Sequence, residues 1–332
     1  MTNTTIYNTF GIIATADSYL VVSDEAALRT LLADPTLADS HLLIIGGGSN
    51  IVFTRHYPGT VLHLENKGIR LLESQGDDLL VEAAAGEVWD DFVHHCIAHG
   101  WHGAENLIAI PGTVGAAPVQ NVGAYGIEAK DIIHSVRTFE VGTGHERVFS
   151  CEECRFAYRD SIFKHELNSR YVVWSVTFRM RKTFCPDIRY KALTDALSDA
   201  GITNPTPLQL ADTIAAVRWS KLPRPEETGS AGSFFKNPVV SAEQYERLRL
   251  QYPDMVAYPA PDGYKLAAGW LIERAGWKGR SLGCCGVYAK QALVLVNLGG
   301  CTGADVVALA DAITADVQKR FDVILEKEAI IV

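Results

Sequence analysis

The chain has 332 residues, a length that fits two or three domains. Hydrophobic residues make up 48% and charged residues 21%, so large cores can form and global disorder is excluded. The formal net charge is −9 and no long run of Lys and Arg occurs, which argues against a nucleic-acid binder. An anionic substrate must therefore be held by a few local cationic side chains and not by the electrostatic field of the whole protein.

Helix and strand patterns alternate along the N-terminal half of the chain. In chain order, the expected elements are a helix over residues 25–33, strands over 42–45, 51–53 and 79–83, a helix over 87–99 and an alternating strand over 171–179. The capping sequence Ser-Asp-Glu at residues 23–25 starts the first helix. Gly100 ends the second helix, whose apolar stripe is expected to hold Val88, Phe92 and Cys96.

A composition break at residues 221–225 (KLPRP) indicates a hinge or linker. Residues 188–200 and 207–219, before the break, have mixed or helical patterns. After it we expect helices over 241–250, 266–275 and 305–321, a buried strand over 292–297 and an alternating strand over 323–332. The helix over 305–321 is amphipathic, with an apolar stripe of Val306, Ala310, Ile313, Val317 and Phe321. Mixed strands and helices without internal repeats predict an α+β architecture.

Two features bear on where the protein resides. Residues 1–20 contain no Lys or Arg and lack the charged and apolar regions of a signal peptide. Residues 106–127 carry no charge, but their prolines, glycines and amides favour a buried, tightly turning loop over a membrane helix. We therefore expect a cytoplasmic protein without membrane insertion.

Seven cysteines are present, an odd number. Cys151 and Cys154 form one CxxC pair, whereas a zinc ribbon needs two such pairs with suitable spacing. The neighbouring Cys284 and Cys285 have no evident function and are expected to serve in packing. The sequence thus predicts reduced thiols and no metal site.

A glycine-rich run follows the expected strand over 42–45: Gly46, Gly47, Gly48, Ser49 and Asn50. Glycines can adopt positive φ and let the backbone approach a ligand, and successive N–H groups can form an anion-binding nest. The pattern is neither GxGxxG nor a Walker loop, and a strand instead of a helix follows it. By itself the run is compatible with a phosphate-binding loop or with a plain turn between strands.

A second loop, residues 110–126 (IPGTVGAAPVQNVGAYG), favours ligand binding. Its small residues let backbone amides crowd against a flat ligand. The two loops together resemble the two-part FAD-binding fold of the vanillyl-alcohol oxidase type, in which the diphosphate lies on the first loop and the second runs along the flavin. Ser49 and Asn50 stand where oxidases often have a nearby His for covalent attachment, so non-covalent FAD is expected.

This resemblance implies a set of FAD contacts in both loops. They are Gly46, Gly47, Gly48, Ser49 and Asn50 in the first loop, and Ile110, Pro111, Gly112, Thr113, Gly115, Ala116, Gln120, Asn121, Gly123, Ala124 and Tyr125 in the second.

More specific motifs occur further along the chain. Residues 157–164 (AYRDSIFK) and 229–238 (GSAGSFFKNP) are similar to two signatures of the UDP-N-acetylenolpyruvoylglucosamine reductase family. Residues 8–10 (NTF), 267–272 (AAGWLI) and 325–328 (LEKE) resemble the same family, and all the motifs follow its order. Tyr190 and its surroundings suggest the longer type, in which a Tyr-bearing loop closes over the substrate.

The resemblance implies a reaction and its catalytic residues. NADPH reduces FAD and leaves, and the enolpyruvyl sugar nucleotide then accepts hydride at its methylene carbon. Ser233 would protonate the neighbouring carbon, while Arg159, which would also contact FAD, and Glu328 would stabilise the enolic intermediate. A guanidinium suits this task because it offers bidentate, permanently charged donors to a developing enediolate.

The family pattern also implies substrate contacts and domain boundaries. The expected substrate contacts are Tyr158, Tyr190, Arg218, Lys221, Asn237 and Gln291. The expected domains are a first FAD-binding subdomain over residues 1–66 with 323–332 returning to it, a second over 67–220, and an α+β substrate-binding domain over 221–322. A monomer that binds UDP-N-acetylglucosamine enolpyruvate and NADPH, and no nucleic acid, is expected.

Simpler interpretations remain open for these residues. Arg159 could be a solvated cation or pair with Asp160, and Ser233 could cap a turn. Glu326 lies two residues before Glu328 and would share its face of a regular strand, so periodicity does not separate them. At the level of the whole protein, the alternatives are another flavoenzyme acting on a sugar or lactone, and a non-catalytic flavin- or nucleotide-binding module.

Overall fold

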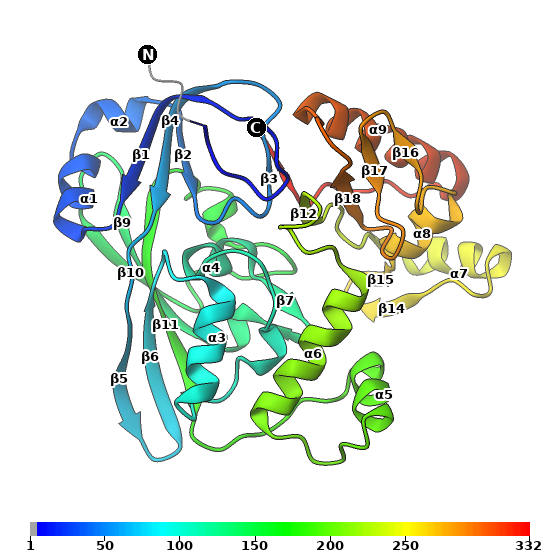
Figure 1. Ribbon diagram of the computed structural model, residues 1–332, viewed down its shortest axis with the longest axis horizontal. Helices are drawn as coiled ribbons and strands as arrows, with labels where there is room; N and C mark the ends of the chain where they lie inside the picture. Colours follow the sequence, from blue (N-terminus) through cyan, green and yellow to red (C-terminus); the bar gives the residue numbers. More distant parts are fainter. Residues whose placement is uncertain (1–4) are drawn as a thin grey trace. The chain divides into compact units, whose positions relative to one another are not determined.

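The computed structural model describes residues 5–332, which divide into two compact units (Figure 1). The first unit contains residues 16–48 and 57–218. The second contains residues 5–15, 49–56 and 219–332. Two short segments of the N-terminal half therefore belong to the same unit as the C-terminal third of the chain.

A three-stranded parallel sheet occupies the N-terminal part of the first unit. Its order is β1 (Ala16–Val22), β4 (Tyr57–Leu64) and β2 (Leu42–Ile45). Helices α1 (Glu25–Leu32) and α2 (Pro35–Asp39) make the crossover from β1 to β2. The α1 helix begins as predicted, because the Asp24 carboxylate accepts the backbone N–H of Ala27 at 2.9 Å. The glycine run follows directly at the carboxyl end of β2.

A five-stranded antiparallel sheet forms the rest of this unit's framework. Its order is β10 (Glu146–Ser150), β9 (Ile133–Glu140), β11 (Tyr171–Arg181), β6 (Asp78–Ala84) and β5 (Ile69–Gln75). The expected alternation in β11 is wrong for most of its length, since every residue from Val172 to Phe178 is buried. A central strand covered on both faces has no solvent side, so it needs no polar alternation.

Helix α3 (Trp89–Ala98) packs on β11 through aromatic contacts. The Phe92 ring centroid lies 4.6 Å from that of Phe178, and the Trp89 centroid lies 5.8 Å from it. The predicted apolar stripe is correct for Phe92 and Cys96 and wrong for Val88, which is exposed in the extended N-cap position. Val88 lies outside the helix, so helical periodicity does not apply to it.

Short elements connect these sheets and carry the second loop. They are η1 (Glu105–Leu107), η2 (Val114–Ala116), α4 (Ala117–Gln120), β7 (Gly123–Ala124), β8 (Ile127–Glu128), η3 (Ala129–Asp131), η4 (Ile162–Lys164), α5 (Lys191–Asp199) and α6 (Pro207–Lys221). The helical interpretation of residues 188–200 and 207–219 is confirmed by α5 and α6. The boundary between the two units falls inside α6, between Arg218 and Trp219.

The second unit contains two small antiparallel sheets and three longer helices. One sheet has the order β12 (Ser230–Ser233), β18 (Val294–Asn297), β17 (Cys285–Val287) and β16 (Ser281–Leu282), and the other has the order β13 (Val239–Val240), β15 (Gly263–Leu266) and β14 (Ala257–Ala260). The helices are α7 (Ala242–Gln251), α8 (Ala268–Arg274) and α9 (Gly303–Phe321). The apolar stripe predicted for α9 is confirmed, because all five of its residues are buried.

The C-terminal segment pairs with a segment from the N-terminal half. β19 (Ile330–Ile331) lies parallel to β3 (Ile51–Val52). The expected strand over 323–332 is regular only at this end, although buried and exposed residues alternate from Val323 to Glu326. Together the two units confirm the α+β class.

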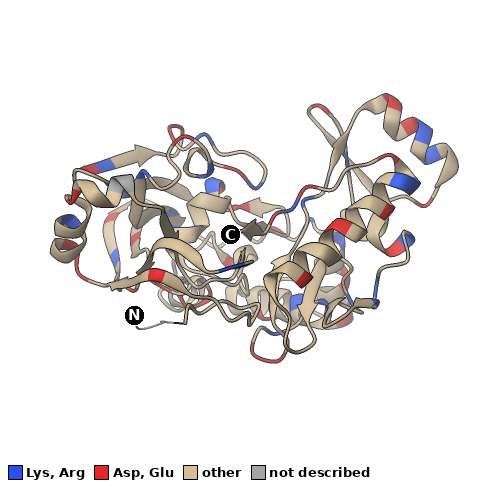
Figure 2. Cartoon of the chain, turned by 90° about the horizontal axis from the view of Figure 1, so that it is seen from above, with Lys and Arg blue, Asp and Glu red and all other residues tan. Residues whose placement is uncertain are grey.

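The distribution of charged residues and the character of the helices agree with the expectations from the sequence. Figure 2 shows Lys and Arg interspersed with Asp and Glu along the chain. Within residues 5–332, no helix combines the length and apolar character needed to cross a bilayer.

Candidate active site

The two glycine loops contact each other in the first unit. A Cβ atom added to Gly46 would collide with Oγ1 of Thr113, and one added to Gly47 would lie 3.5 Å from the Cα of Gly112. Gly48 has φ +62°, a conformation that favours glycine. The glycines thus allow two backbones to come close where larger residues could not, which suits a cradle for a diphosphate and a flat ring.

The second loop is anchored on the junction between β6 and α3. The N–H of Gly115 donates to the carbonyl of Ala85 at 2.9 Å, and the N–H of Trp89 donates to the carbonyl of Gly112 at 3.0 Å. A Cβ atom on Gly115 would lie 2.6 Å from the Cβ of Ala85. The start of the loop is therefore held by main-chain hydrogen bonds.

The motif of residues 157–164 contacts the C-terminal half of this loop. Arg159, at φ +54°, donates from Nη2 to the carbonyl of Gly123 at 2.6 Å and from Nη1 to the carbonyl of Asn121 at 3.3 Å. Its guanidinium lies 3.8 Å from the Glu128 carboxylate and 5.2 Å from the ring centroid of Tyr158. Arg159 thus contacts the loop directly, and the solvated-cation interpretation does not describe it.

Two neighbours of Arg159 complete this contact. Lys164 Nζ donates to Oε1 of Gln120 at 3.1 Å and to the carbonyl of Arg159 at 3.0 Å. Ser161 Oγ donates to the carbonyl of Val119 at 2.8 Å. Asp160, the alternative partner considered for Arg159, lies beside His165 at 2.8 Å. No role was expected for Lys164 or Ser161 from the sequence, although both lie within the motif.

Tyr190 lies against the end of the second loop. Its ring makes an edge-to-face contact with Tyr125, with 5.1 Å between the centroids. The buried Asn106 donates to the carbonyl of Asp187 at 2.8 Å and to the carbonyl of Tyr125 at 3.3 Å. Asn106 therefore ties the Tyr190 segment to the loop, a link that the sequence analysis missed. A polar residue within an otherwise uncharged stretch was the available signal.

Arg218 approaches the same region from α6. Its Nε donates to the carbonyl of Ala109, which has φ +59°. Burial lowers the pKa of Arg218 and raises the pKa of Tyr125. The first unit thus brings Arg218 and Tyr190, two of the expected substrate contacts, close to Tyr125, an expected FAD contact.

In the second unit, main-chain hydrogen bonds bring the segments that carry Ser233 and Glu328 close together. Ser233 ends β12, opposite Val294 of β18. The N–H of Glu328 donates to the carbonyl of Phe234, the residue after Ser233, at 2.8 Å. Asn50 Nδ2 donates to the carbonyl of Glu328 at 3.3 Å. The end of the first glycine loop therefore supports the segment that carries Glu328.

Glu326 and Glu328 differ in their surroundings. The Glu326 side chain is 70% exposed and forms an ion pair with Lys236, whereas Glu328 is half-buried. This difference favours Glu328 as the acid of a site and gives Glu326 an ordinary surface role.

The remaining candidates in the second unit occupy separate positions. Asn237 Oδ1 accepts the N–H of Ala268 at the start of α8, at 2.9 Å. Gln291 Oε1 accepts the N–H of Leu293 at 3.3 Å. Lys221 is exposed at the end of α6. The structure thus gives Asn237 and Gln291 local main-chain partners, and places Arg159 in one unit and Ser233 with Glu328 in the other.

Comparisons with known proteins agree with these two halves. An FAD-binding domain family matches residues 16–150, and the C-terminal domain of UDP-N-acetylenolpyruvoylglucosamine reductase matches residues 224–332. Both glycine loops lie within the first match, and Ser233 and Glu328 lie within the second.

Whole-chain relatives carry the same family name. The chain is 50% identical over 329 residues to a UDP-N-acetylenolpyruvoylglucosamine reductase of Burkholderia ambifaria, covering 98% of this chain and 94% of the relative. It is 46% identical to that of Pseudomonas fluorescens, covering 97% and 95%. A crystal structure of the enzyme from Thermus caldophilus has the same fold, with a TM-score of 0.68 at 23% identity, covering 98% and 95%. This chain therefore belongs to the UDP-N-acetylenolpyruvoylglucosamine reductase family.

Proposed function

We propose that this chain uses NADPH to reduce UDP-N-acetylglucosamine enolpyruvate to UDP-N-acetylmuramate, a step in peptidoglycan precursor synthesis. The observation that carries the proposal is the 50% identity to a reductase of this name over 98% of the chain. The contact between the Ser233 and Glu328 segments supports it, because the reaction needs a proton donor beside a group that stabilises negative charge.

FAD is the cofactor that the first unit would hold. The contact between Gly46 and Thr113, and that between Gly47 and Gly112, make the cradle. Bound there, FAD supplies a hydride carrier that NADPH can reduce. The resemblance assigns the remaining cofactor contacts to Gly48, to Ser49 and Asn50, and to the second loop from Ile110 to Tyr125, together with Arg159.

We expect the FAD to be non-covalent. Neither Ser49 nor Asn50 is a nucleophile of the kind that flavin attachment uses. Purified protein should be yellow, and acid precipitation should release all of the flavin into the supernatant. Yellow colour that stays in a washed pellet would contradict this expectation.

Three side chains of this protein would carry the chemistry on the substrate. Ser233 Oγ would donate a proton to the carbon next to the one that receives hydride. Arg159 and Glu328 would stabilise the negative charge that develops on the carboxylate side before this proton arrives. A serine hydroxyl is a weak acid, so it can serve only next to a strongly basic carbon, and its proton must be replaced afterwards.

Other residues would position the substrate. They are Tyr158, Tyr190, Arg218, Lys221, Asn237 and Gln291. The edge-to-face contact of Tyr190 with Tyr125 supports a role for the Tyr190 segment near the second loop. We further propose that residues 1–66 with 323–332, 67–220 and 221–322 act as three functional parts, and that the protein is a cytoplasmic monomer.

Anaerobic stopped-flow spectroscopy tests the proposed reaction. NADPH should bleach the oxidised flavin absorbance, and the enolpyruvyl sugar nucleotide should then restore it. The product should be heavier than the substrate by two hydrogens. Fast reoxidation by oxygen with none by the enolpyruvyl compound would favour an oxidase, and flavin binding without reduction by NADPH would favour a non-catalytic module.

A further inference from the structure

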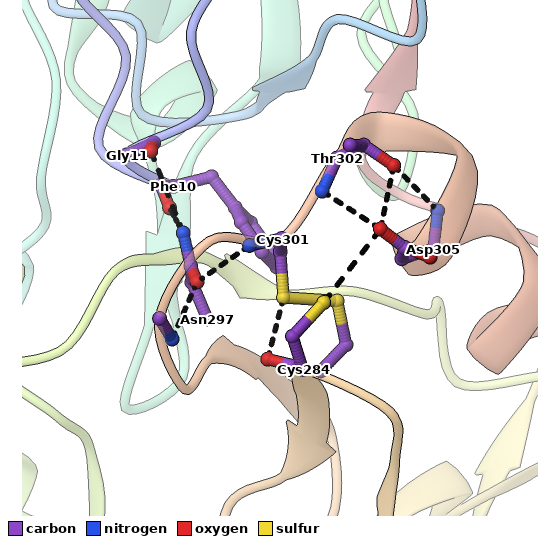
Figure 3. The surroundings of a disulfide bond; sticks show 9 residues. Phe10, Gly11, Cys284, Asn297, Cys301, Thr302 and Asp305 are labelled. Carbon is purple, nitrogen blue, oxygen red and sulfur yellow. Dashed lines mark hydrogen bonds between the residues drawn. A yellow bond between two sulfur atoms is a disulfide. The ribbon is translucent and has the colours of Figure 1, made fainter.

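Three cysteines of the second unit gather, and two of them, Cys284 and Cys285, were expected to serve only in packing (Figure 3). The Sγ atoms of Cys284, Cys285 and Cys301 all lie within 4.8 Å of one another. Cys285 and Cys301 form a disulfide, with 6.0 Å between their Cα atoms. The expectation of seven reduced thiols is therefore wrong for this pair. Cys285 and Cys301 are 16 residues apart, and no local pattern in the sequence indicates their contact.

Main-chain pairing holds the three residues in place. Cys285 lies opposite Asn297 in the antiparallel pair of β17 and β18, and the N–H of Leu298 donates to the carbonyl of Cys284 at 2.9 Å. The Asn297 side chain accepts the N–H of Cys301 at 3.2 Å. The sulfur atoms are thus set close together by the backbone, so their proximity does not depend on the disulfide alone.

A carboxylate lies next to one of the three sulfur atoms, that of Cys284. Cys284 Sγ is 3.6 Å from Oδ2 of Asp305, in the first turn of α9. Asp305 is oriented by Thr302, whose backbone N–H and hydroxyl both donate to Oδ2, at 2.9 Å and 2.6 Å. The positive end of α9 favours negative charge here, both on the carboxylate and on a thiolate at Cys301.

These donors are of the types that a structural zinc site uses. Zinc binds thiolates at about 2.3 Å and carboxylates at about 2.0 Å in a tetrahedron, which gives sulfur–sulfur edges of about 3.8 Å and a sulfur–oxygen edge of about 3.5 Å. The 3.6 Å between Cys284 Sγ and Asp305 Oδ2 is close to the sulfur–oxygen edge, and the three sulfur atoms lie within 4.8 Å of one another. The donation from Thr302 would orient the carboxylate as outer-shell partners do in zinc proteins.

We propose that, once the disulfide is reduced, this cluster binds one Zn²⁺ through Cys284, Cys285, Cys301 and Asp305. Reduction by a small dithiol breaks the Cys285–Cys301 bond: the dithiol loses two electrons and two protons, and two protein thiols form. Zinc then displaces the thiol protons into solvent. A small disulfide such as oxidised glutathione reverses the change by thiol–disulfide exchange, yielding two glutathione thiols, the protein disulfide and released zinc. The metal-bound and disulfide forms therefore exclude each other.

The proposed site is separate from the proposed chemistry. β18 pairs with Ser233 at Val294, at one end of the strand, and with Cys285 at Asn297, at the other end. The zinc proposal rests on the cysteine cluster and does not depend on the reductase activity. Its test therefore needs a readout other than turnover.

Cobalt(II) substitution provides that readout. The FAD-loaded, full-length protein is reduced with a metal-free phosphine, dialysed against a chelator under anaerobic conditions, and titrated with Co²⁺. We expect one Co²⁺ per chain, with the thiolate-to-cobalt charge-transfer and intense visible bands of a tetrahedral site. Zn²⁺ should displace these bands stoichiometrically, and oxidised glutathione should abolish them while releasing the metal. Because the flavin also absorbs, spectra are taken as differences from the metal-free holoprotein.

Matched variants locate the site. Cys284→Ala removes a half-buried ligand, and Asp305→Asn removes the carboxylate charge; each should weaken Co²⁺ binding at least ~10-fold. Cys185→Ala, which alters an exposed cysteine outside the cluster, should leave binding unchanged. FAD content and circular dichroism confirm that each variant folds. A reduced wild-type protein without thiolate–cobalt bands would overturn the proposal, as would bands that survive in Cys284→Ala at equal affinity or are lost in Cys185→Ala.

Discussion

The two units hold their proposed catalytic groups in different ways. In the first unit, the Arg159 side chain itself supports the second loop, through its bonds to the carbonyls of Asn121 and Gly123. In the second unit, main-chain bonds set the position of the Glu328 segment, because its N–H donates to the carbonyl of Phe234. A change at Arg159 should therefore disturb both cofactor binding and chemistry, whereas changes at Ser233 or Glu328 should leave cofactor binding intact.

Glu328→Gln gives the largest effect expected from this comparison. The substitution keeps the shape and the main-chain bond but removes the acid–base function, so FAD content and substrate binding should survive. Turnover should fall by more than ~10²-fold, which suits a residue that acts mainly in the transition state. Steady-state kinetics and the flavin-to-protein ratio measure both effects.

Glu326→Gln is the matched control for that change. Its carboxylate is exposed and pairs with Lys236 at the surface, so the loss should be mild. If Glu326→Gln proved the more damaging of the two, with folding and FAD content unchanged, the assignment of Glu328 would be wrong.

Arg159→Lys probes the other side of the comparison. A single ammonium group does not reproduce the planar fork that reaches two carbonyls, so the second loop should loosen. We expect FAD affinity to fall roughly 10- to 100-fold, on the basis of the usual contribution of hydrogen bonds to charged groups. Fluorescence titration of the apoprotein with FAD measures this. An unchanged FAD affinity would show that Arg159 does not support the cofactor loop.

Arg137→Gln should have the smallest effect, on stability alone. Hydrogen bonds from Arg137 lower the pKa of Glu25 and of Glu146. A carboxylate whose pKa is lowered in the folded state stabilises the fold at pH values above the ordinary pKa range of Glu. This contribution is lost as the pH falls through the lowered pKa. The three side chains are partly exposed, so the loss at neutral pH should be about 1 kcal/mol after solvent screening.

Urea unfolding at neutral and acidic pH checks this prediction. The wild type and Arg137→Gln should differ at pH 7 and converge as the pH falls below the range in which Glu25 and Glu146 are charged. A difference that stays constant over the whole range would mean that packing of the Arg137 stem, and not its charge, accounts for the effect.

Local patterns predicted much of the fold. The stripe from Val306 to Phe321 identified α9, because helical periodicity acts within one element. The errors arose where tertiary context decides the outcome. Val88 follows the same spacing but lies outside its helix, and β11 is buried on both faces by its neighbours.

The candidate site divides in a similar way. The glycines and the family motifs could be found in the sequence, since each is a short continuous segment. The links between segments could not: Asn106 joins Tyr125 to Asp187, and Cys285 meets Cys301. Such contacts depend on how distant parts of the chain pack, and a single sequence does not contain that information in any local pattern.

The central claim is that Ser233, in the second unit, supplies a proton to the substrate and takes no part in the reduction of the flavin by NADPH. Rapid kinetics of Ser233→Ala tests this claim most directly. Reduction of the flavin by NADPH should remain close to the wild-type rate. Reoxidation by the enolpyruvyl substrate should slow by at least ~10²-fold, the lower end of the effect of losing a positioned acid. Equal slowing of both half-reactions would contradict the account and give Ser233 a structural role.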